Sequence, residues 1–146
     1  MKEDKIQVLV EELLKIFPLI RRDIMHASRN QEIKLSPHEH ISLNIIARHS
    51  PISMTELSRA LGVSNQQMTR IVDALVEMHL VERLTSPDNR RLVLAQLTDK
   101  GKQTLEYIKN QKKQHLSNKL TVLSEEEIEQ CIHYLTELNK IMAKLK

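Results

Sequence analysis

The chain has 146 residues, with 22 Lys and Arg against 19 Asp and Glu, so its formal net charge is only +3. This mild basicity permits nucleic-acid binding but does not require it, and three aromatic residues are too few for the stacking platforms that recognise single strands or RNA loops. Cys131 is the only cysteine, which excludes an intrachain disulfide and a Cys-rich zinc site. No apolar run reaches the roughly 20 residues of a membrane span, so we expect a cytoplasmic protein without a membrane partner.

An amphipathic helix is expected near the N-terminus. Apolar residues recur at spacings of three and four from Ile6 to Ile24, the pattern of one helical face. Pro18 removes a backbone donor, so the helix should kink there or end nearby. A loop is expected over residues 30–35.

A second helix begins at Ser36. Ser36 fits the N-cap, Pro37 the first helical position and Glu39 the reciprocal position of a capping box. The helix should stop before Pro51. Its inward-facing residues are expected to be Ile41, Ile45 and Ile46.

Two short helices follow, joined by a sharp turn. A capping box at Ser53 and Glu56 opens a helix to about Leu61, Gly62 supplies the permissive backbone of the turn, and Ser64 starts a helix to about His79. Apolar side chains on the facing sides, together with one small residue, should join the two helices: Leu57, Ser58, Leu61, Val63, Met68 and Ile71. This is the pattern of a helix-turn-helix.

A β-hairpin comes next. Val81–Thr85 and Leu92–Leu97 are strand-like runs, and residues 86–91 between them are rich in turn formers. Thr98 fits the N-cap of a long helix to about residue 118. A hairpin directly after a helix-turn-helix indicates a winged lobe.

The last helix starts at another capping box, made by Ser124 and Glu127. Its apolar residues are spaced by about 3.5, as in a helix packed against another long helix. We expect it to bury Ile128, Cys131, Ile132, Leu135, Leu138, Met142 and Leu145.

The helix from Ser64 has the side chains of a DNA-reading helix. Amides pair with adenine edges and arginine with guanine, while hydroxyls and the N–H groups of a helix start suit phosphates. The candidate DNA-binding residues on this helix are Ser64, Asn65, Gln66, Gln67, Thr69 and Arg70. Met68, Ile71, Val72 and Leu75 should face the core, and Gln66, Gln67, Thr69, Arg70 and Asp73 should face outward.

The hairpin tip adds Asp88, Arg90 and Arg91 to the candidate DNA-binding residues. An arginine on a thin hairpin can enter a narrow minor groove, and Asp88 is placed to hold Arg90 by a charge-assisted hydrogen bond. For Arg91 we expect a solvated or phosphate-binding role, and for Arg83 a salt bridge or a phosphate contact.

The segments resemble the multiple-antibiotic-resistance regulator (MarR) family. The resemblance is carried by Leu61–Ser64, Thr69–Leu75, Leu80–Arg83, Ser86–Arg91 and Leu97–Gly101, and the flanking helices extend it over nearly the whole chain. It implies a homodimer with interlocking terminal helices on a pseudo-palindromic DNA operator. It also implies repression that a small-molecule effector or oxidation relieves. On this resemblance Arg90 matches the wing arginine that enters the minor groove and Asp88 the wing aspartate, and Gln66, Gln67, Thr69 and Arg70 fall where the recognition helix meets DNA.

Other functions stay open at this stage. A winged helix can be a protein-binding adaptor, and the DNA-binding class includes activators. Glu39 and His40 are similar to part of the family's zinc-sensing site, but the paired histidines on the helix after the wing are missing. Cys131 lies on the apolar stripe of the last helix, where packing is the more common role than redox sensing. Motifs for an enzyme are absent, so we expect no catalysis.

The sequence therefore predicts a mainly α protein with a winged helix-turn-helix lobe over residues 36–102 and a two-stranded β wing. Residues 1–35 and 103–146 are expected to form a helical dimerisation region. We expect no metal or cofactor, and the crevice between the two regions is the expected place for the effector. The operator sequence and the identity of the effector do not follow from the sequence.

Overall fold

The computed structural model describes residues 1–29 and 33–146, with side chains described for 1–22 and 33–146. It divides into two compact units. One comprises Met25–Lys112, and the other comprises Met1–Ile24 together with Lys113–Lys146. Each unit is described by itself below.

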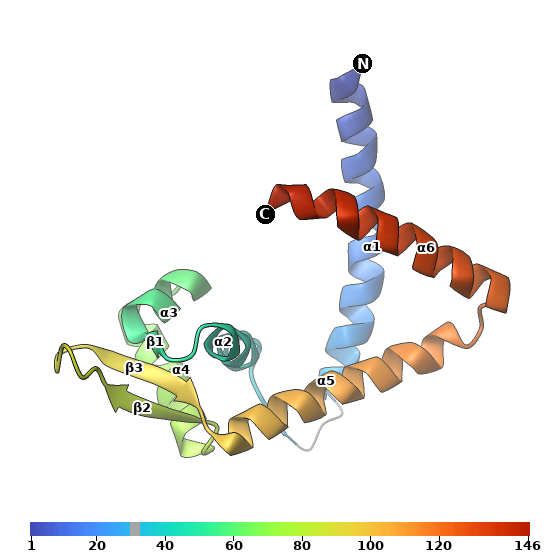
Figure 1. The fold of residues 1–146 in the computed structure, drawn as a ribbon. Coiled ribbons are helices and arrows are strands. Elements are labelled where there is room, and N and C mark those ends of the chain that lie inside the picture. Colours follow the sequence, from blue (N-terminus) through green and yellow to red (C-terminus); the bar gives the residue numbers. More distant parts are fainter. Residues whose placement is uncertain (30–32) are drawn as a thin grey trace. The chain divides into compact units, whose positions relative to one another are not determined.

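The unit Met25–Lys112 contains three whole helices, parts of two further helices and a small sheet (Figure 1). The helices are α2 (Pro37–Arg48), α3 (Met54–Leu61) and α4 (Asn65–Glu77). The strands are β1 (Ile52–Ser53), β2 (Val81–Thr85) and β3 (Val93–Leu97), antiparallel in the order β1-β3-β2. In the figure the β2–β3 hairpin extends away from the helices, and α5 starts where β3 ends.

Strand β1 is a third strand of the sheet, beside the two strands of the wing that the sequence predicts. Ile52 and Ser53 of β1 pair with Ala95 and Leu94 on one edge of β3, and β2 pairs with the other edge of β3. Two residues are too short to show the alternation that reveals a strand in a sequence. Ser53 also caps α3, because its hydroxyl accepts the Glu56 N–H at 3.1 Å.

The core of this unit lies between the three helices and the sheet. It is formed by buried side chains from every element: Leu43, Ile46, Ile52, Leu57, Met68, Ile71, Val72, Leu75, Leu80, Val81, Ala95 and Leu97. All four inward positions expected on α4 are among them. Their burial on one side of α4 leaves the other side of the helix free for a ligand.

The inward face of α2 differs from the expectation in one residue. The Ser36–Glu39 capping box forms as predicted. Ile46 is fully buried and Ile45 is partly buried, but Ile41 is 46% exposed and the buried positions nearest it are Ser42 and Leu43. The helix is therefore rotated slightly from the expected orientation, which the spacing of isoleucines alone could not define.

Helix α5 (Asp99–Leu120) belongs to both units, with Lys112 in one and Lys113 in the other. The Thr98 hydroxyl accepts the Gly101 N–H at 3.0 Å, so Thr98 caps this helix as predicted. Gly101, Thr104 and Ile108 are its buried residues.

The other unit contains α1 (Lys2–Arg29) up to Ile24, the end of α5, α6 (Glu125–Met142) and the 3₁₀ turn η1 (Ala143–Leu145). Helix α1 continues through Pro18, and the Ser124–Glu127 capping box opens α6. No helix in the described ranges is long and apolar enough to cross a membrane.

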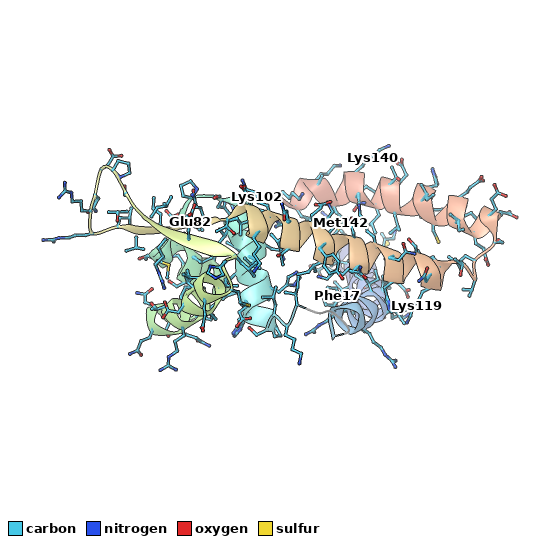
Figure 2. All side chains as sticks on the ribbon, turned by 90° about the horizontal axis from the view of Figure 1, so that it is seen from below. Phe17, Glu82, Lys102, Lys119, Lys140 and Met142 are labelled. Carbon is cyan, nitrogen blue, oxygen red and sulfur yellow. The ribbon has the colours of Figure 1, made fainter. Side chains whose placement is uncertain are left out.

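The burial expected for α6 is not found within the single chain. No residue of α6 is buried. The exposed side chains include five that were expected to be buried: Ile128, Cys131, Ile132, Leu135 and Leu145. Helix α1 also exposes large apolar side chains, among them Phe17, labelled in Figure 2. The apolar stripes exist as the sequence indicated, and many of their described residues remain exposed in the single chain.

Candidate nucleic-acid interface

The turn between α3 and α4 depends on Gly62 and Ser64. Gly62 adopts φ 74, a left-handed conformation that glycine reaches without strain, and its N–H donates to the Ser58 carbonyl oxygen at 2.9 Å. Ser64 then caps α4, because its hydroxyl accepts the Gln67 N–H at 3.1 Å. The two helices are thus joined by the tight turn that the sequence predicts.

A buried serine fixes the contact between the two helices. Ser58 is only 4% exposed, and its Oγ lies 2.8 Å from both the Thr55 carbonyl oxygen and Asn65 Oδ1. The oxygen of Asn65 is therefore engaged with α3. Of the candidate DNA-binding residues on α4, Asn65 is the one whose side chain already has a partner in a neighbouring helix.

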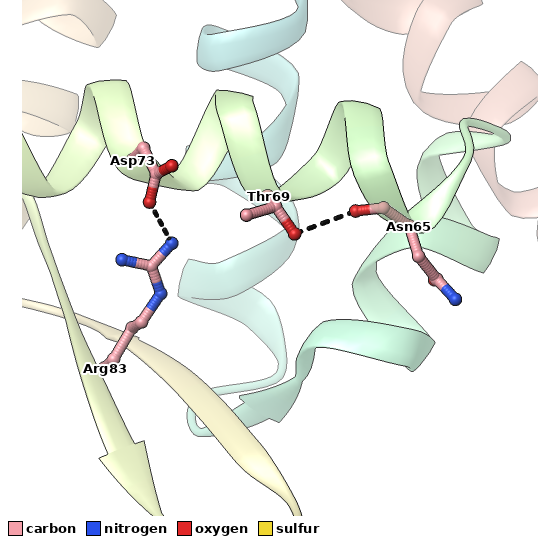
Figure 3. A network of polar contacts seen from close by, with 4 residues as sticks. All are labelled: Asn65, Thr69, Asp73 and Arg83. Carbon is pink, nitrogen blue, oxygen red and sulfur yellow. Dashed lines mark hydrogen bonds and ion pairs between the residues drawn. The ribbon is translucent and has the colours of Figure 1, made fainter.

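The outward face of α4 is polar, as predicted. Gln66, Gln67, Thr69, Arg70 and Asp73 are all exposed. Thr69 Oγ1 donates to the Asn65 carbonyl oxygen at 2.9 Å (Figure 3). Within the described ranges the side chains of Gln66, Gln67 and Arg70 make no hydrogen bond, so their donors and acceptors are available to a ligand.

Asn89 holds the tip of the wing. Its carbonyl oxygen accepts the Leu92 N–H at 3.0 Å, and its side-chain oxygen accepts the Arg91 N–H at 3.1 Å. These bonds leave Arg90 and Arg91 exposed at the centre of the turn. Sequence reasoning missed this role of Asn89, although an asparagine that bonds the backbone two residues ahead is a common turn former.

The expected contact between Asp88 and Arg90 is not found among the described residues. Both side chains are exposed at the tip. The turn is closed by the Asn89 bonds instead, which do not need a charge from Asp88. Arg90 is therefore exposed without a hydrogen bond to Asp88, and its contact with DNA stays a prediction.

An open groove of about 490 Å³ lies between α4 and the wing. It is lined by Met54, Thr55, Thr69, Asp73, Arg83, Arg91, Leu92 and Val93. Asp73 and Arg83 form an ion pair inside it (Figure 3). The expectation of a salt bridge for Arg83 is confirmed. Arg91, rather than Arg90, is the wing arginine that lines this groove.

His40 lies beside a lysine rather than beside acidic groups. Its Nε2 is 3.5 Å from Lys112 Nζ and 3.3 Å from Asn44 Nδ2. Burial and, to a smaller extent, the Lys112 charge lower the pKa of His40 below its ordinary value of 6.5. Burial also lowers the pKa of Lys112. An ammonium group beside this nitrogen opposes a metal cation there, and the described part of the chain contains no group of three metal-type ligands.

Comparison with known proteins finds relatives of this chain and a family model that matches its winged lobe. The model of the MarR family matches residues 35–93. The HTH-type transcriptional regulator YpoP of Bacillus subtilis is 27% identical over 128 residues, covering 88% of this chain and 89% of YpoP. The transcriptional repressor MdtR of the same organism is 24% identical over 126 residues, covering 86% and 80% of the two chains.

Solved structures agree on the fold. The transcriptional regulator Tm0710 from Thermotoga maritima superposes with a TM-score of 0.81 at 24% identity, covering 94% of this chain and 96% of Tm0710. A mutant of S. aureus MepR bound to an oligodeoxyribonucleotide gives a TM-score of 0.70 at 20% identity, covering 92% and 98%. The winged lobe, its exposed polar helix and these likenesses converge: residues 35–93 match the model of the MarR family, and over most of its length the chain is similar to HTH-type transcriptional regulators.

Proposed function

We propose that the protein is a repressor that binds a pseudo-palindromic operator as a homodimer and releases it when a small molecule binds. The observation that carries the proposal is the exposed polar face of α4, lying beside a wing whose tip exposes two arginines. A helix of this kind suits a major groove, and a thin arginine-bearing hairpin suits the adjacent minor groove.

The candidate residues divide into three roles. Gln66, Gln67 and Arg70 read base edges, because their side chains are exposed and uncommitted. Ser64, Asn65 and Thr69 lie at the start of α4, where hydroxyls and free N–H groups suit phosphate oxygens. Arg90 and Arg91 grip the groove or backbone beside the helix, and Asp88 lies next to them at the tip.

Homodimerisation is supported by the apolar side chains that one chain leaves exposed. Helix α6 exposes Ile128, Ile132 and Leu135, and α1 exposes further large apolar residues such as Leu9 and Phe17. Burial of such surface releases about 25 cal/mol per Å². A second copy offers the matching stripes, and a two-fold axis would place two wings on half-sites about 34–36 Å apart.

Repression and release rest on the family and its named repressors. MdtR, named a transcriptional repressor, aligns over most of this chain. A ligand can act as an inducer only if it binds the DNA-incompetent conformation better than the competent one. Since the target is DNA, we propose that the protein acts in the compartment that holds the genome, the cytoplasm of a bacterial cell.

The test begins with the protein and a random duplex library. Repeated selection of bound duplexes should enrich one two-fold symmetric sequence, and sedimentation should show two chains per duplex. Placing the selected sequence over a reporter promoter should lower transcription when the protein is present. Failure to enrich any sequence would contradict specific DNA binding, and an increase in transcription would replace repression by activation.

A further inference from the structure

The C-terminal end of α4 is capped by the start of α5. Thr98 Oγ1 donates to the His79 carbonyl oxygen at 2.6 Å, and Lys100 Nζ donates to the Met78 carbonyl oxygen at 3.1 Å. The Thr98 N–H donates to the Leu80 carbonyl oxygen at 3.1 Å. Met78, His79 and Leu80 directly follow the last residue of α4, and these bonds satisfy carbonyl oxygens that would otherwise turn to water.

This contact also requires a glycine. Gly101 is buried in the first turn of α5, and a Cβ atom there would lie 2.1 Å from the Leu80 carbonyl oxygen. The chain reaches this position through His79, which has φ 62 in the left-handed region. A side chain at residue 101 would force the two segments apart, so their spacing is closely defined.

The charge of Lys100 suits its position. Helix α4 has no basic residue in its own last turn. A cation near the C-terminal end of a helix stabilises the negative end of its dipole. Lys100 provides that cation from the next helix along the chain, at hydrogen-bonding distance from Met78.

We propose that Thr98 and Lys100 are positioning residues for the DNA readout, holding α4 at a defined angle to α5 without touching DNA. The proposal rests on the DNA-binding function proposed above. The proposed base-reading side chains lie at the start of α4, whereas Thr98 and Lys100 form hydrogen bonds with the residues that directly follow its end. A tilt of about 5° about that end moves the start of a helix ~20 Å long by about 1.7 Å. Functional contacts need placement within about 0.5 Å, so a small loosening at this end degrades readout.

These hydrogen bonds join the first turn of α5 directly to the end of α4, besides the covalent connection through the β2–β3 hairpin. Helix α5 continues past Lys112 into the unit that contains α6. A movement of its first turn must carry the carbonyls that Thr98 and Lys100 hold, and α4 with them.

The first test compares two lysines of α5. Lys102, labelled in Figure 2, is exposed, has the same charge and makes no side-chain hydrogen bond within the described residues, so Lys102→Met is the matched control. The probes are a duplex of about 30 base pairs selected by the wild-type protein, long enough for two half-sites, and a scrambled duplex of equal composition. Lys100→Met should weaken binding to the selected duplex by about threefold, leaving scrambled binding and the salt slope unchanged.

The second test uses Thr98. Thr98→Val removes the hydroxyl, and with it both the bond to the His79 carbonyl oxygen and the cap on the Gly101 N–H. It should reduce discrimination between the two duplexes by at least about fivefold, the worth of one ordinary hydrogen bond. Thr98→Ser keeps the hydroxyl and should restore discrimination, whereas a loss caused by altered packing would persist. Both variants are measured well below their unfolding temperatures, which circular dichroism establishes. If Thr98→Val does not fold, the comparison of Lys100→Met with Lys102→Met still tests the positioning role.

The outcomes distinguish failure of the positioning role from failure of the proposed DNA-binding function. If the wild-type protein binds both duplexes equally or neither, the DNA-binding proposal fails. If it discriminates and the Lys100 and Thr98 variants discriminate equally well, only the positioning role is overturned. Equal weakening on both duplexes by Lys100→Met, with a shallower salt slope, would show that Lys100 contacts phosphate, which also overturns it.

Discussion

Asp73 on α4 and Arg83 on β2 form an ion pair in the groove between α4 and the wing (Figure 3). The carboxylate side chain is 59% exposed and the guanidinium 33% exposed, so the pair is partly solvated. Pairs of this kind contribute about 0.2–1 kcal/mol to stability. Its larger effect concerns charge: Asp73 neutralises an arginine that faces the same groove as Arg91.

Asp73→Asn should therefore tighten binding to DNA of any sequence. The change removes a carboxylate from the groove and frees Arg83 for phosphate, which should steepen the salt dependence by about 0.9 per added phosphate contact. Titrations of a scrambled duplex at several salt concentrations measure this. Glu106→Gln removes an exposed carboxylate of α5 elsewhere in the same unit and serves as the control. An unchanged slope would mean that Arg83 lies out of reach of the backbone.

Arg70→Ala tests base readout by α4. The exposed guanidinium has no partner within the described residues, so its loss should leave stability unchanged. Binding to the selected operator should weaken by about 1–3 kcal/mol, with relaxed discrimination at one base pair per half-site. Arg48→Ala on α2, which removes an exposed arginine elsewhere in the same unit, is the control. Equal affinity of Arg70→Ala and wild type for every operator variant would remove Arg70 from the readout.

Arg90→Ala and Arg91→Ala test the two arginines of the wing separately. Each should weaken binding, and each lost phosphate contact should reduce the salt slope by about 0.9. Arg91 lines the groove beside α4, whereas Arg90 does not. Replacing A·T pairs at the operator flanks by G·C widens the minor groove. This replacement should reduce DNA affinity less in the variant that lacks the inserted arginine than in the wild-type protein. A wild-type salt slope in both variants would show that the wing does not touch DNA.

Leu135→Glu tests the proposed dimer. Leu135 is 53% exposed on the apolar stripe of α6. Since about half of the side chain remains to be buried, loss of its burial in both copies, at about 0.8–1.5 kcal/mol each, should raise the dimer dissociation constant by at least about 10-fold. Sedimentation equilibrium measures this, with Gln130→Glu outside the stripe as control. Truncation after Leu123 should also give monomers that fail to bind the operator. A truncated chain that sediments as a dimer would exclude α6 from the interface.

The stability of the protein should decrease below about pH 6.5. Burial first and Lys112 second lower the pKa of His40 in the folded protein, so the unfolded chain binds this proton more readily. The stabilising effect of neutral His40 is therefore complete above the unfolded pKa of 6.5 and is lost as the pH falls toward the folded pKa. Urea unfolding at several pH values measures it. His40→Gln should remove part of the decline; an identical pH profile would show that His40 does not contribute.

Local signals in the sequence predicted the winged lobe closely. The capping serines Ser36, Ser64 and Ser124 mark helix starts because a side-chain oxygen satisfies N–H groups only a few residues away. Gly62 marks the turn because few other residues adopt its conformation without strain. These features depend on residues near in sequence, and they also defined the polar face of α4.

Features that depend on distant residues were predicted less well. Strand β1 is defined by its pairing with β3, some 40 residues away, and its two residues show no period of their own. The bond between Thr98 and His79 and the pairing of Asp73 with Arg83 likewise join segments that no local pattern connects.

The sequence by itself determined the order of helices and strands, the exposed polar face of α4 and the presence of apolar stripes on the terminal helices, because short-range hydrogen bonding and periodicity specify all three. Only the tertiary structure decided which wing arginine lines the groove, which carboxylate pairs with Arg83 and how closely α5 holds the end of α4. These relationships depend on ångström-scale packing between elements, and such packing results from the whole core rather than from any single segment.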